Sequence, residues 1–164
     1  DELWDIFEQC HQLLTEAGYQ QYETSAYAKP GFQCQHNLNY WRFGDYLAIG
    51  CGAHGKLTFP DGDILRFSKT KHPKGYLRGE YLYEEKNVEK NARAFEFFMN
   101  RFRLLEAVPK QEFDHYTGLS QSAVKNQIDL AIQQNYIVET LDSWQITEHG
   151  KLFLNELLAL FLDE

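Results

Sequence analysis

Apolar residues recur at helical spacing over the first part of the chain, at Leu3, Ile6, Phe7, Cys10, Leu13, Leu14 and Ala17. Gly18 follows directly, and a glycine just after the last periodic position is typical of a helix C-terminus. The next residues, 19–27, have the composition of a strand. This order of helix, glycine and strand predicts one unit of an α/β repeat.

The middle of the chain predicts short strands joined by tight turns. Residues 46–50 are expected to form an apolar strand that ends in the run Gly50-Cys51-Gly52-Ala53-His54-Gly55. Residues 56–59 and 64–67 flank the sequence Pro-Asp-Gly-Asp, which predicts a β-hairpin. The sequence His-Pro-Lys-Gly at 72–75 indicates a short helix with proline in its first turn.

The last third of the chain is predicted to be mostly helical. Helices are expected at 94–105, 111–117, 120–134 and 151–162, and two strands at 136–139 and 144–147. Pro109 ends the first of these helices, and Ser120 and Thr147 are residue types that cap helix N-termini. Three helices, a two-stranded wing and a final helix form a winged-helix pattern.

Composition and charge narrow the functions that this fold could serve. Hydrophobic residues make up 43% and charged residues 24% of the 164 residues, as in an ordinary globular protein. The chain has 16 basic and 24 acidic residues, so its formal net charge is −8. The predicted helix at 120–134 carries one basic residue, Lys125, whereas a helix that reads the DNA major groove needs several. Nucleic acid is therefore not an expected partner, and the winged region is interpreted as a packing module.

The three cysteines, Cys10, Cys34 and Cys51, bear on the cellular compartment. An odd and sparse set argues against a secreted disulfide scaffold and favours the reducing cytoplasm. Unpaired thiols are the simpler interpretation, and convergence of all three on a metal is the alternative. The apolar runs are shorter than the ~20 residues that cross a membrane, and no signal peptide is recognisable. Because the sequence begins without Met and inside a predicted helix, we expect it to be part of a larger protein.

The first candidate site is the sequence His36-Asn37-Leu38-Asn39-Tyr40-Trp41, in a segment expected to be a short helical turn or loop. A neutral imidazole is a good ligand for iron or zinc, and aromatic side chains can pack on a flat macrocycle. The alternative is structural: both large aromatic side chains would be buried and the histidine would bond a carbonyl group.

Two further segments could contact a ligand. The glycines of residues 50–55 allow close approach to the backbone, whose N–H groups can bind an anion or an adenine edge. The alternative is a tight turn into the hairpin. Residues 56–78 hold six basic side chains and two acidic ones, and they could bind ligand carboxylates or form a solvated hairpin surface. No Ser-His-Asp arrangement, P-loop or His-Glu-x-x-His motif is present, so no catalytic residue is expected in this chain.

Four segments together resemble the HemW family of radical S-adenosylmethionine (SAM) proteins, described as oxygen-independent coproporphyrinogen III oxidase-like. They are Tyr-Glu-Thr-Ser-Ala-Tyr-Ala-Lys-Pro at 22–30, the two candidate segments at 36–41 and 50–55, and Phe-Glu-Phe-Phe-Met-Asn-Arg-Phe-Arg-Leu at 95–104. The resemblance extends over the chain and places it after the radical-SAM core. It implies an α+β fold: residues 1–80 are expected to contain the last units of a radical-SAM α/β partial barrel with a β-hairpin. Residues 81–164 are expected to form a mostly helical, winged-helix-like C-terminal domain.

The resemblance also implies ligands and the residues that contact them. The family's His-Asn-x-x-Tyr-Trp element is associated with heme, which implies heme-binding roles for His36, Asn37, Tyr40 and Trp41, with His36 as the candidate iron ligand. The glycine-rich run implies a rim of the SAM pocket at Gly50, Gly52, Ala53 and His54. The family holds a [4Fe–4S] cluster on a Cys-x-x-x-Cys-x-x-Cys loop that this sequence lacks. The cluster ligands are therefore expected outside this chain, and the chain alone is not expected to perform radical chemistry.

Two main functions are implied for the whole protein. One is a cytoplasmic heme chaperone that delivers heme to a recipient hemoprotein, including peripheral contact with membrane-bound hemoproteins. The other is an enzyme that oxidatively decarboxylates the propionates of coproporphyrinogen III. The His36 segment favours the first, and the basic stretch fits both because both ligands carry propionates. A third alternative is that these residues only form a structural cap on the barrel.

Overall fold

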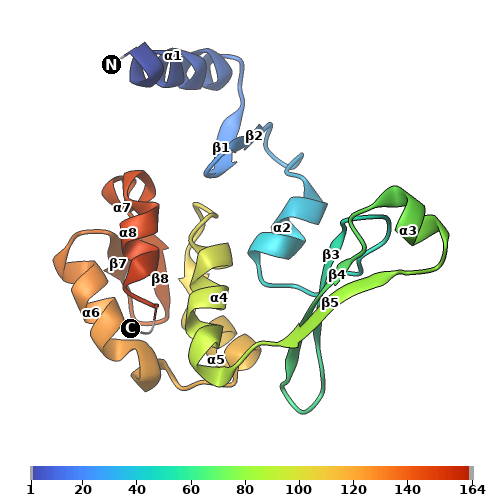
Figure 1. Ribbon diagram of the computed structural model, residues 1–164. Coiled ribbons are helices and arrows are strands. Elements are labelled where there is room, and N and C mark those ends of the chain that lie inside the picture. The colour runs from blue at the N-terminus through green and yellow to red at the C-terminus, as the bar shows by residue number, and fades with distance from the viewer. Residues whose placement is uncertain (1, 163–164) are drawn as a thin grey trace.

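The computed structural model describes residues 2–162, which fold into short helices and three small antiparallel sheets (Figure 1). The helices are α1 (Glu2–Glu16), α2 (Gln35–Trp41), α3 (Pro73–Leu77), α4 (Arg93–Arg101), α5 (Lys110–Thr117), α6 (Lys125–Gln133), α7 (Glu148–Leu152) and α8 (Leu154–Ala159), with 3₁₀ turns at Lys90–Ala92 and Gln121–Val124. The strands are β1 (Gln20–Glu23), β2 (Ala26–Ala28), β3 (His54–Thr58), β4 (Ile64–Lys69), β5 (Leu82–Asn87), β6 (Val108–Pro109), β7 (Ile137–Glu139) and β8 (Ser143–Ile146). The sheets have the orders β1-β2, β3-β4-β5 and β6-β8-β7, so the predicted α+β class is confirmed.

Helix α1 confirms the first predicted helix, and Gly18 follows it with a φ of +82°. Such a left-handed conformation favours glycine, which explains why the helix ends there. Helix α1 contributes no buried residue, and its apolar side chains, such as Leu3 and Ile6, are exposed. Figure 1 accordingly shows α1 at one edge, joined to the rest through β1.

The single strand predicted over residues 19–27 is wrong, because the structure forms a β1–β2 hairpin there. The carboxylate of Glu23 accepts hydrogen bonds from the backbone N–H and the hydroxyl of Ser25, at 3.1 and 3.0 Å. An acidic side chain that bonds the backbone two residues later stabilises a tight turn. The side chain of Glu23 therefore reverses the chain at the point where a continuous strand was expected.

The strand predicted over residues 46–50 is also wrong. Only Tyr46 pairs with a neighbouring segment, through two backbone hydrogen bonds with Lys56. Leu47 and Ile49 are 70% and 83% exposed, and the described residues provide no strand beside them. The glycine run at 50–55 therefore forms a turn that leads into β3, and it does not follow a strand.

The hairpin predicted around residues 60–63 is confirmed as β3 and β4, and the short helix after His72 is confirmed as α3. Strand β5, which pairs with β4, was not predicted. All six of its residues are exposed. A strand with no buried side requires no alternation of apolar and polar residues, and that alternation is the signal by which a strand is predicted. Because β5 lies at residues 82–87, the sheet continues past the boundary expected at residue 80. The division into residues 1–80 and 81–164 thus stays a prediction.

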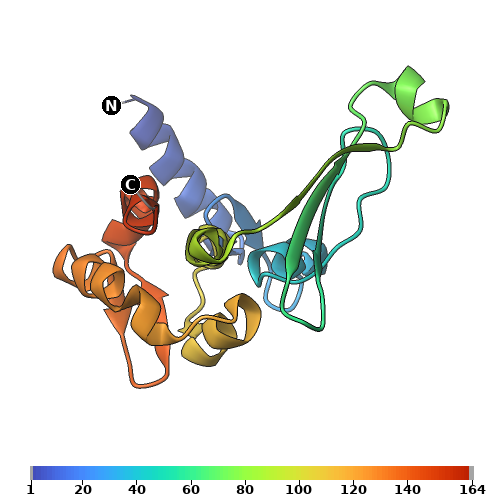
Figure 2. The same cartoon turned by 60° about the horizontal axis from the view of Figure 1, so that its bottom comes forward.

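Aromatic side chains around α4 form the centre of the core. Phe97 and Phe98 are fully buried on α4, and they pack on Phe113 of α5 at ring distances of 5.5 and 5.4 Å. Trp144 of β8 and Phe161 extend this cluster from the C-terminal region. Figure 2 shows α4 nearly end-on, between the C-terminal helices and the β3-β4-β5 sheet. Helix α4 is therefore the element against which both sides of the fold pack.

The C-terminal elements follow the predicted order, with two boundary corrections. The helix predicted over 94–105 ends at Arg101, and the following segment enters β6, a third strand beside the two expected ones. The last helix is divided at Phe153 into α7 and α8 and begins earlier than predicted. The hydroxyl of Thr147 accepts the backbone N–H of Gly150 at 2.9 Å, which confirms the expected cap.

Candidate functional site

Helix α2 presents the histidine of the first candidate segment to solvent. His36 lies in the first turn and Tyr40 lies one turn later, so both side chains occupy the same face. Their rings meet edge to face, with centroids 4.5 Å apart and an interplanar angle of 84°. His36 is exposed, and within residues 2–162 its ring has no hydrogen-bond partner. The hydrogen bond to a carbonyl group that the structural alternative expects is therefore absent among the described residues, while Tyr40 and Trp41 are half-buried.

A row of aromatic rings continues from this histidine toward the sheet. Tyr40 packs edge to face on Tyr46, at a centroid distance of 4.1 Å. The hydroxyl of Tyr46 accepts a 2.8 Å hydrogen bond from Nη1 of Arg66 on β4. Burial is the main cause that raises the pKa of Tyr46, so its hydroxyl stays protonated at neutral pH. The row made of His36, Tyr40 and Tyr46, called the aromatic row below, connects the exposed end of α2 to the β3-β4-β5 sheet.

His36 and Tyr40 are one helical turn apart, and so are Asn37 and Trp41, so each pair shares one side of α2. The two pairs begin at successive residues and therefore occupy different sides of the helix. The ring of Trp41 lies under the guanidinium group of Arg103, 4.4 Å from its central carbon. Its Nε1 atom is buried and has no hydrogen-bond partner within the described residues. Of the four predicted heme-binding residues, His36 is thus exposed, Asn37, Tyr40 and Trp41 are half-buried, and Trp41 packs against Arg103.

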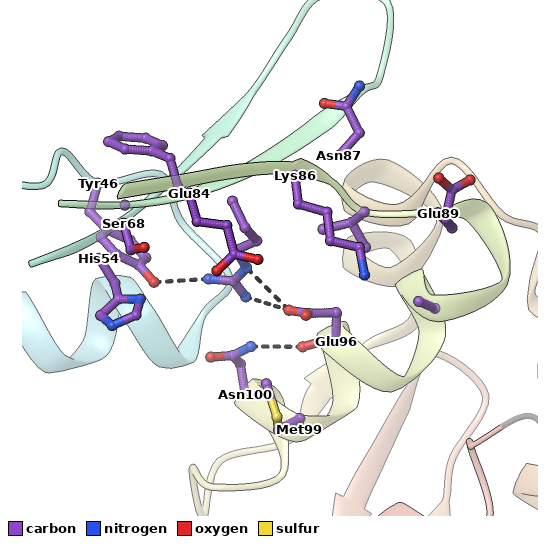
Figure 3. Close-up of a pocket in the computed structure, with 15 residues that line it drawn as sticks. Tyr46, His54, Ser68, Glu84, Lys86, Asn87, Glu89, Glu96, Met99 and Asn100 are labelled. Atoms are coloured by element: carbon purple, nitrogen blue, oxygen red, sulfur yellow. Dashed lines mark hydrogen bonds and ion pairs between the residues drawn. The ribbon is translucent and has the colours of Figure 1, made fainter. Parts of the chain in front are cut away.

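A cavity of about 500 Å³ lies beside the aromatic row, between β4, β5 and α4 (Figure 3). Tyr46 and His54 line one end of it, and Met99 and Asn100 of α4 line its lower side in the figure. Arg66 donates two hydrogen bonds to Glu96, which fixes its guanidinium group within the lining. The cavity has the size and the mixed polar and apolar lining of a small-molecule site.

The residues predicted to form the SAM rim are held by bonds inside the chain. The backbone N–H groups of Gly50, Gly52 and Ala53 donate to Tyr76 Oη, Thr70 O and Gly50 O, at 3.0, 3.0 and 3.3 Å. These amides are therefore not available to bind a ligand in this conformation. His54 is different, because its exposed side chain lines the cavity described above. Of the four residues, His54 alone lines this cavity.

The basic stretch at 56–78 does not form one positive surface. Lys56 is 1% exposed and bonds Asp45 at 2.9 Å, and burial is the main cause that lowers its pKa. Arg66 pairs with Glu96, and Arg78 pairs with Glu80. Lys69 and Lys71 lie over the rings of Phe67 and Tyr83. Three of the six basic groups are thus neutralised locally, and the buried Lys56 cannot reach a ligand carboxylate.

The three cysteines form no disulfide bond within the described residues. Cys10, Cys34 and Cys51 are free and exposed. Residues 2–162 contain no group of three or more His, Cys, Asp or Glu side chains placed to hold a metal ion. Over the same residues, no helix is long and apolar enough to span a membrane.

Several residues of the site were not predicted from the sequence. Tyr46, Arg66 and Met99 became neighbours of His54 only through the pairing of β3 with β4 and the packing of α4. Arg103, which covers Trp41, is 62 positions later in the chain. Arg103 lies in the family-like segment at 95–104, and this was the one feature of the sequence that pointed to a role for it. Such long-range contacts leave no local pattern in a single sequence.

Comparisons with known proteins agree with the family resemblance. Residues 88–153 match the model of the HemN C-terminal domain. The chain is 88% identical over its full length to "Heme chaperone HemW" of Haemophilus influenzae and 70% identical to the protein of that name from Escherichia coli. It spans 43% of the length of each of these curated relatives. The protein of that name from Bacillus subtilis is 29% identical over 98% of the chain.

A solved structure supports the fold. The chain superposes with a TM-score of 0.68 on the coproporphyrinogen III oxidase HemN from Escherichia coli, whose description calls it a radical SAM enzyme. The superposition covers 96% of this chain and 40% of that one, at 14% sequence identity, so it establishes shared architecture alone. The two relatives of high identity show that the chain belongs to the HemW family, of which it represents a C-terminal portion, with a HemN C-terminal domain at residues 88–153.

Proposed function

We propose that the protein containing this chain is a heme chaperone, and that the exposed face of α2 is part of its heme-binding site. His36 and Tyr40 are the proposed contacts, with the imidazole of His36 as an axial ligand of the heme iron. Heme is the cargo in this proposal, and a hemoprotein that receives heme is the partner. The names of the two relatives from Haemophilus influenzae and Escherichia coli support the activity, and the geometry of α2 supports the residues.

The observation that carries the proposal is the state of the His36 ring. It is exposed, has no hydrogen-bond partner among the described residues, and packs at 4.5 Å on the edge of Tyr40. A neutral imidazole with a free nitrogen is a strong donor to heme iron. Tyr40 and Tyr46 provide apolar ring surface next to it, against which the edge of a porphyrin can pack.

The finer architecture is also part of the proposal. Residues 1–80 would complete a radical-SAM barrel whose other strands lie upstream, and those strands would cover Leu47, Ile49 and the apolar side of α1. The region from α4 to α8 would be a winged-helix-like domain that packs rather than binds nucleic acid. Its Lys125 is occupied by an ion pair with Asp129 at 2.8 Å. SAM and a [4Fe–4S] cluster would be bound mainly by residues outside this chain.

We propose supporting roles, rather than direct ligand contacts, for Asn37, Trp41 and the glycine run. Trp41 is covered by Arg103, so we assign it and Asn37 to the support of α2 rather than to the heme. Gly50, Gly52 and Ala53 would shape the SAM pocket through their turn, since their N–H groups are already used. His54 would face the cavity next to Tyr46.

A hemin titration of the full-length protein tests the proposal. The His36→Ala variant is expected to bind hemin more weakly and to shift the Soret band, while the thermal unfolding midpoint stays nearly constant because the side chain is exposed. His115→Ala is a matched control: His115 is also an exposed helical histidine that packs edge-on to a tyrosine, Tyr116, at 5.0 Å. An unchanged Soret band in His36→Ala would contradict the assignment. A decarboxylation assay with coproporphyrinogen III separates the chaperone from the oxidase.

A further inference from the structure

The C-terminal end of α2 is bonded to the segment that follows α4. Arg42, the residue after α2, donates from Nε and Nη2 to the two carboxylate oxygens of Glu106, at 2.9 and 2.7 Å. A planar guanidinium group that bonds both oxygens of a carboxylate fixes orientation as well as distance. The end of α2 thus has a defined direction relative to the C-terminal domain.

Glu106 is itself held from the other side by a buried arginine. Arg101 is 1% exposed and donates from Nη1 to Glu106 Oε1 at 2.9 Å, and its Nε lies 3.0 Å from a carboxylate oxygen of Glu112. The hydrogen bonds from Arg42 are the main cause that lowers the pKa of Glu106, so the carboxylate is ionised at neutral pH. Arg101 therefore keeps the Glu106 carboxylate in place for Arg42.

A second contact lies one residue earlier in α2. The guanidinium group of Arg103 covers Trp41 and also approaches Glu23, at 3.4 Å between Nη2 and Oε2. The backbone of the same segment pairs with β1, through hydrogen bonds from Thr24 N to Arg103 O and from Leu105 N to Tyr22 O. Residues 103–106 therefore contact both α2 and the β1–β2 hairpin.

These contacts act at one end of α2 and leave the other end free. Phe43, two residues after α2, is 1% exposed and packs on Phe97 of α4 at 5.6 Å. Within residues 2–162, the ring of Tyr40 is the one aromatic group that His36, in the first turn, contacts. A short helix fixed at its C-terminal end holds its N-terminal side chains in a constant direction without covering them.

We propose that Arg42 and Arg103 are positioning residues for the heme site, through which the C-terminal domain sets the direction of His36. This inference rests on the proposed function of α2 and adds how the site is oriented. Residues that orient a metal ligand from outside its contact shell commonly change affinity by about tenfold or more when they are removed. Arg42 is well suited to a test, because its side chain is 47% exposed and its loss removes little packing.

The test is a hemin titration of the full-length protein with Arg42→Gln, Arg42→Lys and Arg103→Lys. Arg42→Gln is expected to weaken hemin binding about tenfold and to move the Soret band toward that of His36→Ala. Its thermal unfolding midpoint should fall only slightly, because the lost ion pair is largely exposed. Arg42→Lys keeps the charge and loses the two-point contact, so it should restore part of the affinity. Arg103→Lys should weaken binding because a lysine cannot stack flat on Trp41. Lys125→Gln removes a more exposed ion pair on α6 and should bind hemin normally.

The outcomes separate this inference from the proposed function. Normal hemin affinity and a normal Soret band in Arg42→Gln, together with a clear loss in His36→Ala, would overturn the positioning role alone. Normal hemin binding in His36→Ala would overturn the proposed function of α2, and the positioning role with it. A weakened Arg42→Gln that Arg42→Lys partly restores, with Lys125→Gln unaffected, would support the positioning role.

Discussion

The ε-amino group of Lys56 lies 2.9 Å from a carboxylate oxygen of Asp45, although the lysine side chain is 1% exposed. It also donates to Phe43 O at 2.9 Å and to Thr58 Oγ1 at 3.0 Å, so all three of its protons have acceptors. A buried ammonium group is tolerated only when it is paired and hydrogen-bonded in this way. This lysine joins the residues that follow α2 to strand β3.

Replacing Asp45 with Asn should destabilise the protein by about 2 kcal/mol, because the change leaves the buried charge of Lys56 without its counterion. The loss is expected to be smaller than for a fully buried pair, since Asp45 is 40% exposed and water can approach it. Denaturant unfolding measures the effect. The double variant Asp45→Asn/Lys56→Met removes both charges and should be more stable than Asp45→Asn alone. Equal stability of the two variants would show that the buried charge of Lys56 costs little without its counterion.

Acid should weaken the contact between Arg42 and Glu106. The pKa of Glu106 lies below its ordinary value, first because Arg42 donates hydrogen bonds to it. The folded pKa is thus lower than the unfolded one, so the stabilisation is complete above the ordinary carboxyl pKa of about 4.3. It is lost as pH falls through the lowered value. Thermal unfolding midpoints of the parent protein and Glu106→Gln should differ most near neutral pH and converge in acid, whereas an exposed control, Glu80→Gln, should show little difference at any pH.

Local sequence patterns were sufficient to predict much of the fold. The periodic apolar residues before Gly18 predicted α1, and the turn residues at 60–63 predicted the β3–β4 hairpin. The caps at Ser120 and Thr147 identified the starts of two helical segments. Each of these signals depends on residues that are close in sequence, for which a single sequence is informative.

The errors occurred where a long-range contact or a side chain decided the conformation. The turn at Ser25 depends on the carboxylate of Glu23, and β5 depends on pairing with β4 although its own residues are all exposed. For the site, the sequence identified His36, Asn37, Tyr40 and Trp41 as one candidate segment. It could not show that Trp41 lies under Arg103, because that contact requires the folded arrangement of α2 and the segment that follows α4.

Gly150 should not tolerate alanine. A Cβ atom at this position would collide with the carbonyl oxygen of Tyr136, and the backbone offers no flexible atom that could move away. We expect Gly150→Ala to destabilise the C-terminal region by about 3 kcal/mol, at the upper end of the range for inserted methyl groups. The fluorescence of Trp144, which is 2% exposed, reports on unfolding there. Glu148→Ala changes an exposed residue of the same helix and should have a small effect, and a small effect of Gly150→Ala would contradict the close contact.

Tyr40 should control the affinity for heme through its ring rather than its hydroxyl group. The ring lies between His36 and Tyr46, at centroid distances of 4.5 and 4.1 Å, and the hydrogen bond from Arg66 goes to Tyr46 instead. Tyr40→Phe keeps both edge-to-face contacts, so it should bind hemin with nearly the parent affinity. Tyr40→Ala removes the surface that restricts the rotation of His36, and such aromatic contacts contribute about 0.5–1.5 kcal/mol each. A hemin titration should therefore show a loss of about twofold to twelvefold for Tyr40→Ala, which follows from that energy. A comparable loss in Tyr40→Phe would instead assign the effect to the hydroxyl group and would remove the aromatic row from the explanation.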